Sequence, residues 1–173
     1  MRPLMAALVA LAVLAGCSDT GTDDGSTTTT TEPGEPALED GTWFAFVTVG
    51  EDEDGAMTLG IDLADMLTGE EAREAAVEDG ALAEGEELPN DLYIDNDDVV
   101  LELLHTAEDA RFVMISGEDV AEKIQVDAPL FAEIYDGTYS GDPLYGVVPQ
   151  TPIAMDVVVS GGLVTDATAV YLP

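Results

Sequence analysis

Alternation of apolar and polar residues marks a strand between residues 57 and 63. Every second residue of this run is apolar, and the residues between are Thr58, Gly60 and Asp62. A strand with this pattern buries one face and exposes the other to water. The run 43–49 is rich in aromatic and β-branched residues and predicts a preceding strand. The charged turn 51–55 lies between the two runs, so the pattern predicts a β-hairpin.

Two segments carry the signals of a helix start. In the first, Thr68 is predicted to cap the amide of Glu71, and Leu67 is predicted to pack on Ala72. Gly80 is a natural stop for this helix. In the second, the run Asp-Ala-Pro at 127–129 predicts the start of a short helix that Gly137 ends.

The remaining apolar runs predict strands at 92–94, 99–104 and 112–115, and a closing hairpin of 155–159 and 163–172 around the turn 160–162. With the first hairpin, this makes seven runs and two helices, and we expect about six strands in the barrel or sheet. The sequence therefore predicts an α+β fold. We expect a small β-rich barrel or a strongly curved antiparallel sheet, with the OB type as one candidate, carrying one capped helix and a second short one.

The amino terminus predicts export and lipidation. Residues 4–14 form an apolar run behind Arg2, shorter than the roughly 20 residues that a membrane-spanning helix needs. Leu14-Ala15-Gly16-Cys17 resembles a bacterial lipobox, in which the Cys17 thiol accepts diacylglycerol. We therefore expect residues 1–16 to be a signal peptide. Two acyl chains hold a protein stably on a membrane, so we expect an extracytoplasmic protein that is lipid-anchored to the bacterial cell membrane.

Composition changes at Gly41. Residues 17–40 are acidic and rich in Thr, Pro and Gly, with few apolar side chains, which predicts a disordered tether. The Trp, all five Tyr and all four Phe follow Gly41. We therefore expect a single globular domain at 41–173.

Net charge excludes one class of partner. The chain has 37 Asp and Glu against 4 Lys and Arg, a formal charge of −33, and such a surface repels nucleic acid. With 46% apolar residues the chain still has enough to bury a core. The composition resembles that of proteins adapted to saline surroundings, with acidic drift in a high-GC genome as the alternative. We expect the protein to be monomeric.

Few residues have side chains suited to catalysis. The chain has one histidine, His105, and its one cysteine is the expected lipidation site. Thiol catalysis and a cysteine-ligated zinc site are therefore excluded, and no serine lies in a Gly-x-Ser-x-Gly elbow. We expect a non-catalytic module that binds an envelope protein, a glycan or a cation. An envelope hydrolase that uses paired carboxylates remains the alternative.

Calcium is the one metal ion for which the sequence offers candidate ligands, because calcium binds oxygen atoms. The candidate ligands lie in two acidic turns: Asp52, Asp54, Asp95, Asn96, Asp97 and Asp98. Neither turn has the spaced Asp-x-Asp-x-Asp-Gly pattern with a distant Glu. No cofactor is therefore expected, with calcium binding by these turns as the alternative.

A longer pattern resembles a protein family. Its residues are Leu67, Thr68, Gly69, Glu71 and Ala72, followed by Pro89, Asn90, Asp91, Tyr93, Ile94 and Asn96. This pattern resembles uncharacterised exported proteins of actinobacteria and related Gram-positive bacteria that carry Leu-Thr-Gly-Glu-Glu-Ala and then Pro-Asn-Asp-Tyr-Tyr-Ile-x-Asn. The terminal Tyr171-Leu172-Pro173 is similar to the end of that family.

The resemblance spans about residues 43–173 and implies a cell-envelope setting and a compact β-rich fold, but no catalytic residue. The chain departs from the family where Leu92 and the pair Ile153-Ala154 replace aromatic residues. We expect Asn90 and Asp91 to be structural, closing the turn before the strand at 92–94 with side-chain to backbone hydrogen bonds.

Overall fold

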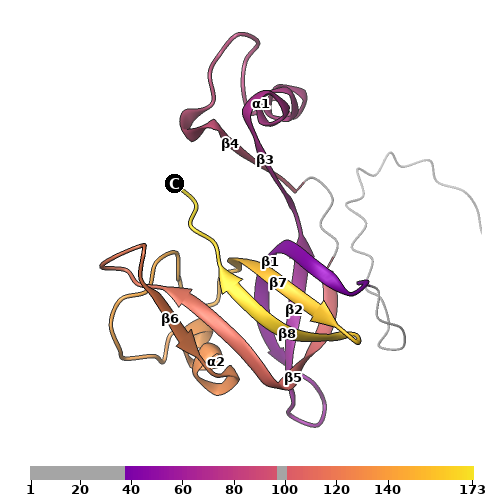
Figure 1. Ribbon diagram of the computed structural model, residues 1–173, viewed down its shortest axis with the longest axis vertical. Coiled ribbons are helices and arrows are strands. Elements are labelled where there is room, and N and C mark those ends of the chain that lie inside the picture. Colours follow the sequence, from indigo (N-terminus) through magenta and orange to yellow (C-terminus); the bar gives the residue numbers. More distant parts are fainter. Residues whose placement is uncertain (1–37, 97–100) are drawn as a thin grey trace, which may run out of the picture.

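Five strands close a β-barrel in the computed structural model, which describes residues 38–96 and 101–173 (Figure 1). They are β1 (Gly41–Glu51), β2 (Met57–Leu63), β5 (Leu101–Ile115), β7 (Ile153–Ser160) and β8 (Leu163–Ala169). The strands follow the order β2-β1-β7-β8-β5, and pairing of β2 with β5 closes the ring. The expected signal peptide, Cys17, the tether up to residue 37, Asp97 and Asp98 lie outside the described residues.

The connectivity is that of an OB-type barrel. The first barrel strand pairs with the second and the fourth, and the third pairs in parallel with the fifth, β5 with β8. The other barrel pairs are antiparallel. The predicted α+β barrel is confirmed, and its one parallel pair distinguishes it from a purely antiparallel sheet.

An insertion between the second and third barrel strands projects from the barrel, at the top of Figure 1. It contains β3 (Asp65–Thr68), α1 (Gly69–Glu78), the short 3-10 turn η1 (Pro89–Asp91) and β4 (Leu92–Asp95). Strands β3 and β4 pair antiparallel in a separate two-stranded sheet, and α1 packs on both. We call residues 65–95 the arm.

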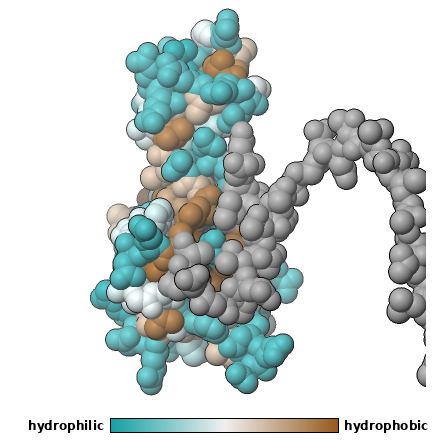
Figure 2. Space-filling model, turned by 90° about the vertical axis from the view of Figure 1, so that its right-hand side faces the viewer, coloured by the Kyte–Doolittle hydropathy of each residue, from teal (hydrophilic) through white to brown (hydrophobic). Residues whose placement is uncertain are grey.

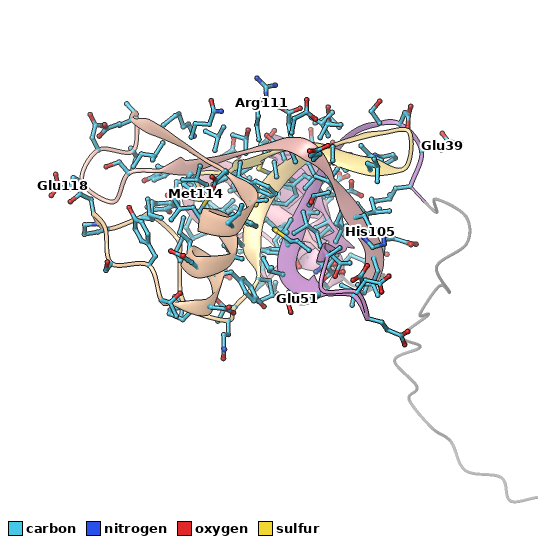
Figure 3. The ribbon with its side chains drawn as sticks, turned by 90° about the horizontal axis from the view of Figure 1, so that it is seen from below. Glu39, Glu51, His105, Arg111, Met114 and Glu118 are labelled. Atoms are coloured by element: carbon cyan, nitrogen blue, oxygen red, sulfur yellow. The ribbon has the colours of Figure 1, made fainter. Side chains whose placement is uncertain are left out.

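The inward-facing side chains of the alternating strands fill the barrel interior, as the sequence predicts. Val47 of β1, Ile61 of β2 and Val157 of β7 are fully buried. In the view of Figure 3, Met114 of β5 points into the barrel and Arg111 of the same strand points away. The inward side chains therefore form one core between the strands.

Helix α2 (Ala128–Asp136) packs against the barrel core from outside the ring of strands. Phe131 of α2 and Phe112 of β5 are both 0% exposed, and their rings stack at a centroid distance of 4.4 Å. The helix begins as predicted, since the Asp127 carboxylate accepts a hydrogen bond from the Leu130 amide at 3.0 Å. It ends at Gly137, whose φ of 76° is the left-handed conformation that glycine favours.

Several predicted details are wrong. The first helix does begin after Thr68, but no side-chain hydrogen bond caps it. Leu67 and Thr68 belong to β3, where Leu67 pairs with Tyr93. Residues 101–104 of one predicted strand and 112–115 of the next belong to the single strand β5, whose pairing with β8 shifts register between Thr106 and Arg111; residues 99 and 100 of the first prediction lie outside the described residues.

Other boundaries also differ from the prediction. Neither β3 nor β6 (Lys123–Val126) is predicted by the sequence pattern, and β6 extends the sheet beyond β5. Strand β8 ends at Ala169 rather than at residue 172. Leu38, expected in the tether, is 5% exposed and belongs to the core. Within residues 38–96 and 101–173, no helix is long and apolar enough to cross a bilayer.

Candidate functional site

A cleft of about 1160 Å³ lies between the arm and the barrel. The barrel contributes Trp43 and Phe44 from β1 and Leu63 from β2. The arm contributes the start of β3, the end of β4 and the last turn of α1. Figure 2 shows apolar surface gathered where the arm meets the barrel, between hydrophilic surfaces above and below.

The barrel wall of the cleft is aromatic. Phe44 lies next to the inward-facing Ala45 and therefore faces outward. Its ring meets the ring of Phe46 edge-on, with 6.0 Å between the ring centroids. The Trp43 indole donates a hydrogen bond from Nε1 to the backbone oxygen of Glu39 at 3.1 Å. Trp43 lies on the same face of β1 as the buried Ala45 and packs against the core, so Phe44 is the aromatic residue of the cleft that lies on the outward face.

The arm wall of the cleft is acidic. Asp65 and Asp95 stand directly opposite each other in the β3–β4 register, and both line the cleft. Like charges in directly opposed positions of a sheet destabilise it. Glu78 and Asp79 line the same wall at the end of α1, whose last turn contains no basic residue. The partial negative charge of a helix carboxyl end adds to theirs.

No Lys, Arg or His is among the described residues that line the cleft. Asp79 accepts a hydrogen bond from the Tyr93 hydroxyl at 2.7 Å, which ties α1 to β4. Asn96, which also lines the cleft, donates from Nδ2 to the Asp62 carboxylate at 3.1 Å. The site is therefore a negatively charged cleft with one aromatic wall.

The four candidate calcium ligands that the structure describes, Asp52, Asp54, Asp95 and Asn96, do not come together. Asp52 and Asp54 lie in the β1–β2 turn, next to Met57, whereas Asp95 and Asn96 lie beyond the opposite end of β2. Asp52 organises its own turn, because its Oδ1 accepts from the amides of Asp54 at 2.9 Å and Ala56 at 2.8 Å. Among residues 38–96 and 101–173, no three His, Cys, Asp or Glu side chains are arranged to hold a metal ion.

The residues of the family pattern gather in the arm. Leu67 and Thr68 form β3; Gly69, Glu71 and Ala72 begin α1; Pro89, Asn90 and Asp91 form η1; Tyr93 and Ile94 lie in β4, and Asn96 follows. This pattern is therefore the sequence of one structural unit, and that unit forms one wall of the cleft.

Asn90 does bond to the backbone, but not within its own turn. Its Nδ2 donates to the backbone oxygen of Pro173 at 3.0 Å, and Asn90 and Asp91 both have positive φ, 65° and 53°. The Tyr145 hydroxyl donates to the oxygen of Leu172, and its ring lies 4.8 Å from that of Tyr171. Residues 171–173 therefore connect the barrel to the arm, between which the chain end lies in Figure 1.

His105 and Asp156 are two further candidates for acid–base chemistry, and both lie outside the cleft. His105 is in β5 on the same face as Leu103, with Nδ1 3.8 Å from the Asp52 carboxylate. Burial raises the pKa of the Asp156 carboxyl, and the charge of Lys123 partly opposes the rise. Asp156 lies on β7 and does not line the cleft. The carboxyl group with the raised pKa is therefore not one of those that line the cleft.

Comparison of the chain with protein-family models, with curated proteins and with solved structures found no match.

Proposed function

We propose that this protein is a non-catalytic lipoprotein of the bacterial cell envelope, and that its cleft binds a cationic ligand outside the membrane. The observation that carries the proposal is the composition of the cleft: four carboxylates and the outward-facing ring of Phe44, with no basic side chain among its described residues. A cation that enters such a cleft is attracted by the carboxylates and by the ring of Phe44.

The opposed pair Asp65 and Asp95 supports the proposal. Without a ligand, each carboxylate faces a like charge across the small sheet of the arm, which weakens the sheet. A bound cation screens the two charges from each other, so binding also stabilises the arm.

Removing one of the opposed charges should have two opposite effects. In Asp95→Asn we expect the free energy of unfolding to rise by about 0.2–1 kcal/mol, because repulsion from Asp65 is lost. We expect binding of hexalysine amide to weaken about three- to tenfold, because one attractive charge is lost. Thermal melting followed by circular dichroism and isothermal titration calorimetry at 50 mM NaCl measure the two effects.

Glu118→Gln is the matched control, because Glu118 is exposed and does not line the cleft. Glu39, whose backbone oxygen accepts the hydrogen bond of the cleft residue Trp43, lies on the opposite side of the barrel from Glu118 (Figure 3). The control removes the same amount of charge, and hexalysine should bind to it nearly as to the unchanged protein. Equal weakening by both variants would mean that hexalysine senses only the net charge. The cleft would then not be the site.

The envelope part of the proposal is tested at Cys17. Cys17→Ala should leave the precursor without lipid, because the thiol that accepts diacylglycerol is missing. Fractionation of cells without detergent should then move the protein from the membrane to the soluble or secreted fraction almost completely, since the acyl chains supply the membrane affinity. Full membrane retention of the variant would contradict lipid anchoring.

A further inference from the structure

We propose that residues 170–173 form a strap that fixes the arm in one position on the barrel and so sets the width of the cleft. When the strap is released, the arm swings about Ala64, the single residue between β2 and β3. The inference concerns the position of the arm, and it does not depend on which ligand the cleft takes.

The arm packs as one unit. Its helix α1 lies on both strands of the small sheet, and Ala72 and Ala76 of α1 are 0% exposed. The Tyr93 hydroxyl of β4 donates a hydrogen bond to the Asp79 carboxylate of α1 at 2.7 Å. A unit that is held together in this way moves as a whole when its connection to the rest of the protein bends.

The connection between the barrel and the arm is short. Strands β3 and β4 form a sheet of their own, and the pairing of β2 with β1 stops at Leu63. Ala64 then donates its amide to the backbone oxygen of Phe44 at 3.2 Å, and β3 leaves the barrel (Figure 1). The bond from Asn96 to Asp62 lies close to the same point. Residues at the end of an element are where hinges commonly occur.

The strap is attached to the barrel at two points. The Val170 amide donates to the backbone oxygen of Ala154 at 2.9 Å. The Tyr145 hydroxyl donates to the backbone oxygen of Leu172. Tyr145 is itself held in place, because its amide donates to the backbone oxygen of the last residue of β5 at 2.9 Å. The strap therefore starts from a part of the protein that does not move with the arm.

The other end of the strap reaches the arm far from the hinge. The Asn90 side chain donates from Nδ2 to the backbone oxygen of Pro173 at 3.0 Å. Asn90 lies just before Leu92, which pairs with Thr68, the last residue of β3. The four residues of β3 span roughly 10–13 Å, so the Asn90 bond resists rotation about Ala64 with a longer lever than the bonds at the base of the arm.

The cleft supplies no charge attraction that would hold the arm in place. Its lining has four carboxylates and, among the residues that the structure describes, no Lys, Arg or His. Like charges repel over the screening length of about 10 Å at 0.1 M salt. The position of the arm therefore depends on the strap.

The test measures the distance between the arm and the barrel by double electron–electron resonance. Spin labels are attached to Glu74→Cys on α1 and Gln125→Cys on β6, two exposed positions. The full chain is used with Cys17→Ser, because Cys17 is its only native cysteine. With the strap intact, we expect one narrow distance distribution.

Asn90→Gly removes the amide that anchors the strap, and glycine readily adopts the φ of 65° found at this position. We expect the distance distribution to become about twofold wider, because the arm then samples several positions. Gln150→Gly is the matched control: it also removes an exposed amide side chain at a positive φ, 57°, and it should leave the distribution unchanged.

Tyr145→Phe releases the barrel end of the strap while keeping the ring, and it carries the test if Asn90→Gly does not fold. We expect similar widening, and little more in the double variant, because two attachments of one strap act in series. A narrow distribution in both single variants would overturn the inference. Fully additive widening would also overturn it, since the two bonds would then act separately.

Discussion

Phe131→Ala should lower the free energy of unfolding by about 3–5 kcal/mol, the cost of removing a fully buried phenylalanine side chain. The residue is 0% exposed and stacks on Phe112, so truncation leaves a cavity where α2 meets the barrel core. Because many domains are stable by only about 5–15 kcal/mol, the variant should lose a large share of its stability. Urea unfolding followed by circular dichroism measures the change.

Glu133→Ala is the matched control on the same helix. Glu133 is exposed, so its truncation should change the free energy of unfolding by less than about 0.5 kcal/mol. A loss below about 1 kcal/mol in Phe131→Ala would mean that α2 contributes little to the core, contrary to the stacked geometry.

Monovalent salt should raise the melting temperature steadily up to molar concentration. The formal charge of the chain is −33. In the part that the structure describes, only His105–Asp52 and Arg111–Asp166 approach within ion-pair distance. The screening length falls from about 10 Å at 0.1 M to about 3 Å at 1 M salt, which removes most of the repulsion between exposed carboxylates. We expect a rise on the order of 10 °C between 50 mM and 2 M NaCl.

Differential scanning calorimetry in NaCl and KCl measures this rise, and the two salts should act alike. Specific calcium binding behaves differently, because it saturates above the dissociation constant. A sharp rise at micromolar calcium with little response to NaCl would contradict self-repulsion as the dominant effect. It would also return the acidic turns at Asp52 and Asp95 to the list of metal ligands.

The barrel strands with alternating side chains were predictable, because alternation records which face is buried. The run 57–63 gave β2 to the residue, and the closing hairpin was placed correctly between Ser160 and Leu163. Strands β3 and β6 have only four residues each, too few for a periodic signal. The parallel contact of β5 with β8 joins residues far apart in the chain, and local patterns carry no record of such pairing.

The cleft was harder to foresee because its walls come from four separate segments. Asp95 and Asn96 were singled out as calcium candidates with Asp97 and Asp98, their neighbours in sequence. In the structure their partners across the cleft wall are Asp65 and Asp62. With 37 acidic residues in the chain, acidity alone could not select these two. The aromatic residues at the start of β1 were recognised as a strand signal and not as a binding surface.

The arm leaves and re-enters the barrel at adjacent points. Asp62, near its start, and Leu101, just after it, are partners in the β2–β5 register. A segment whose two ends are held side by side can be lengthened, shortened or exchanged without disturbing the pairing of the strands that hold it. The barrel is therefore a scaffold on which a different arm would build a different cleft wall. Grafting an unrelated hairpin between residues 63 and 101 is a direct route to new ligand specificity on the same core.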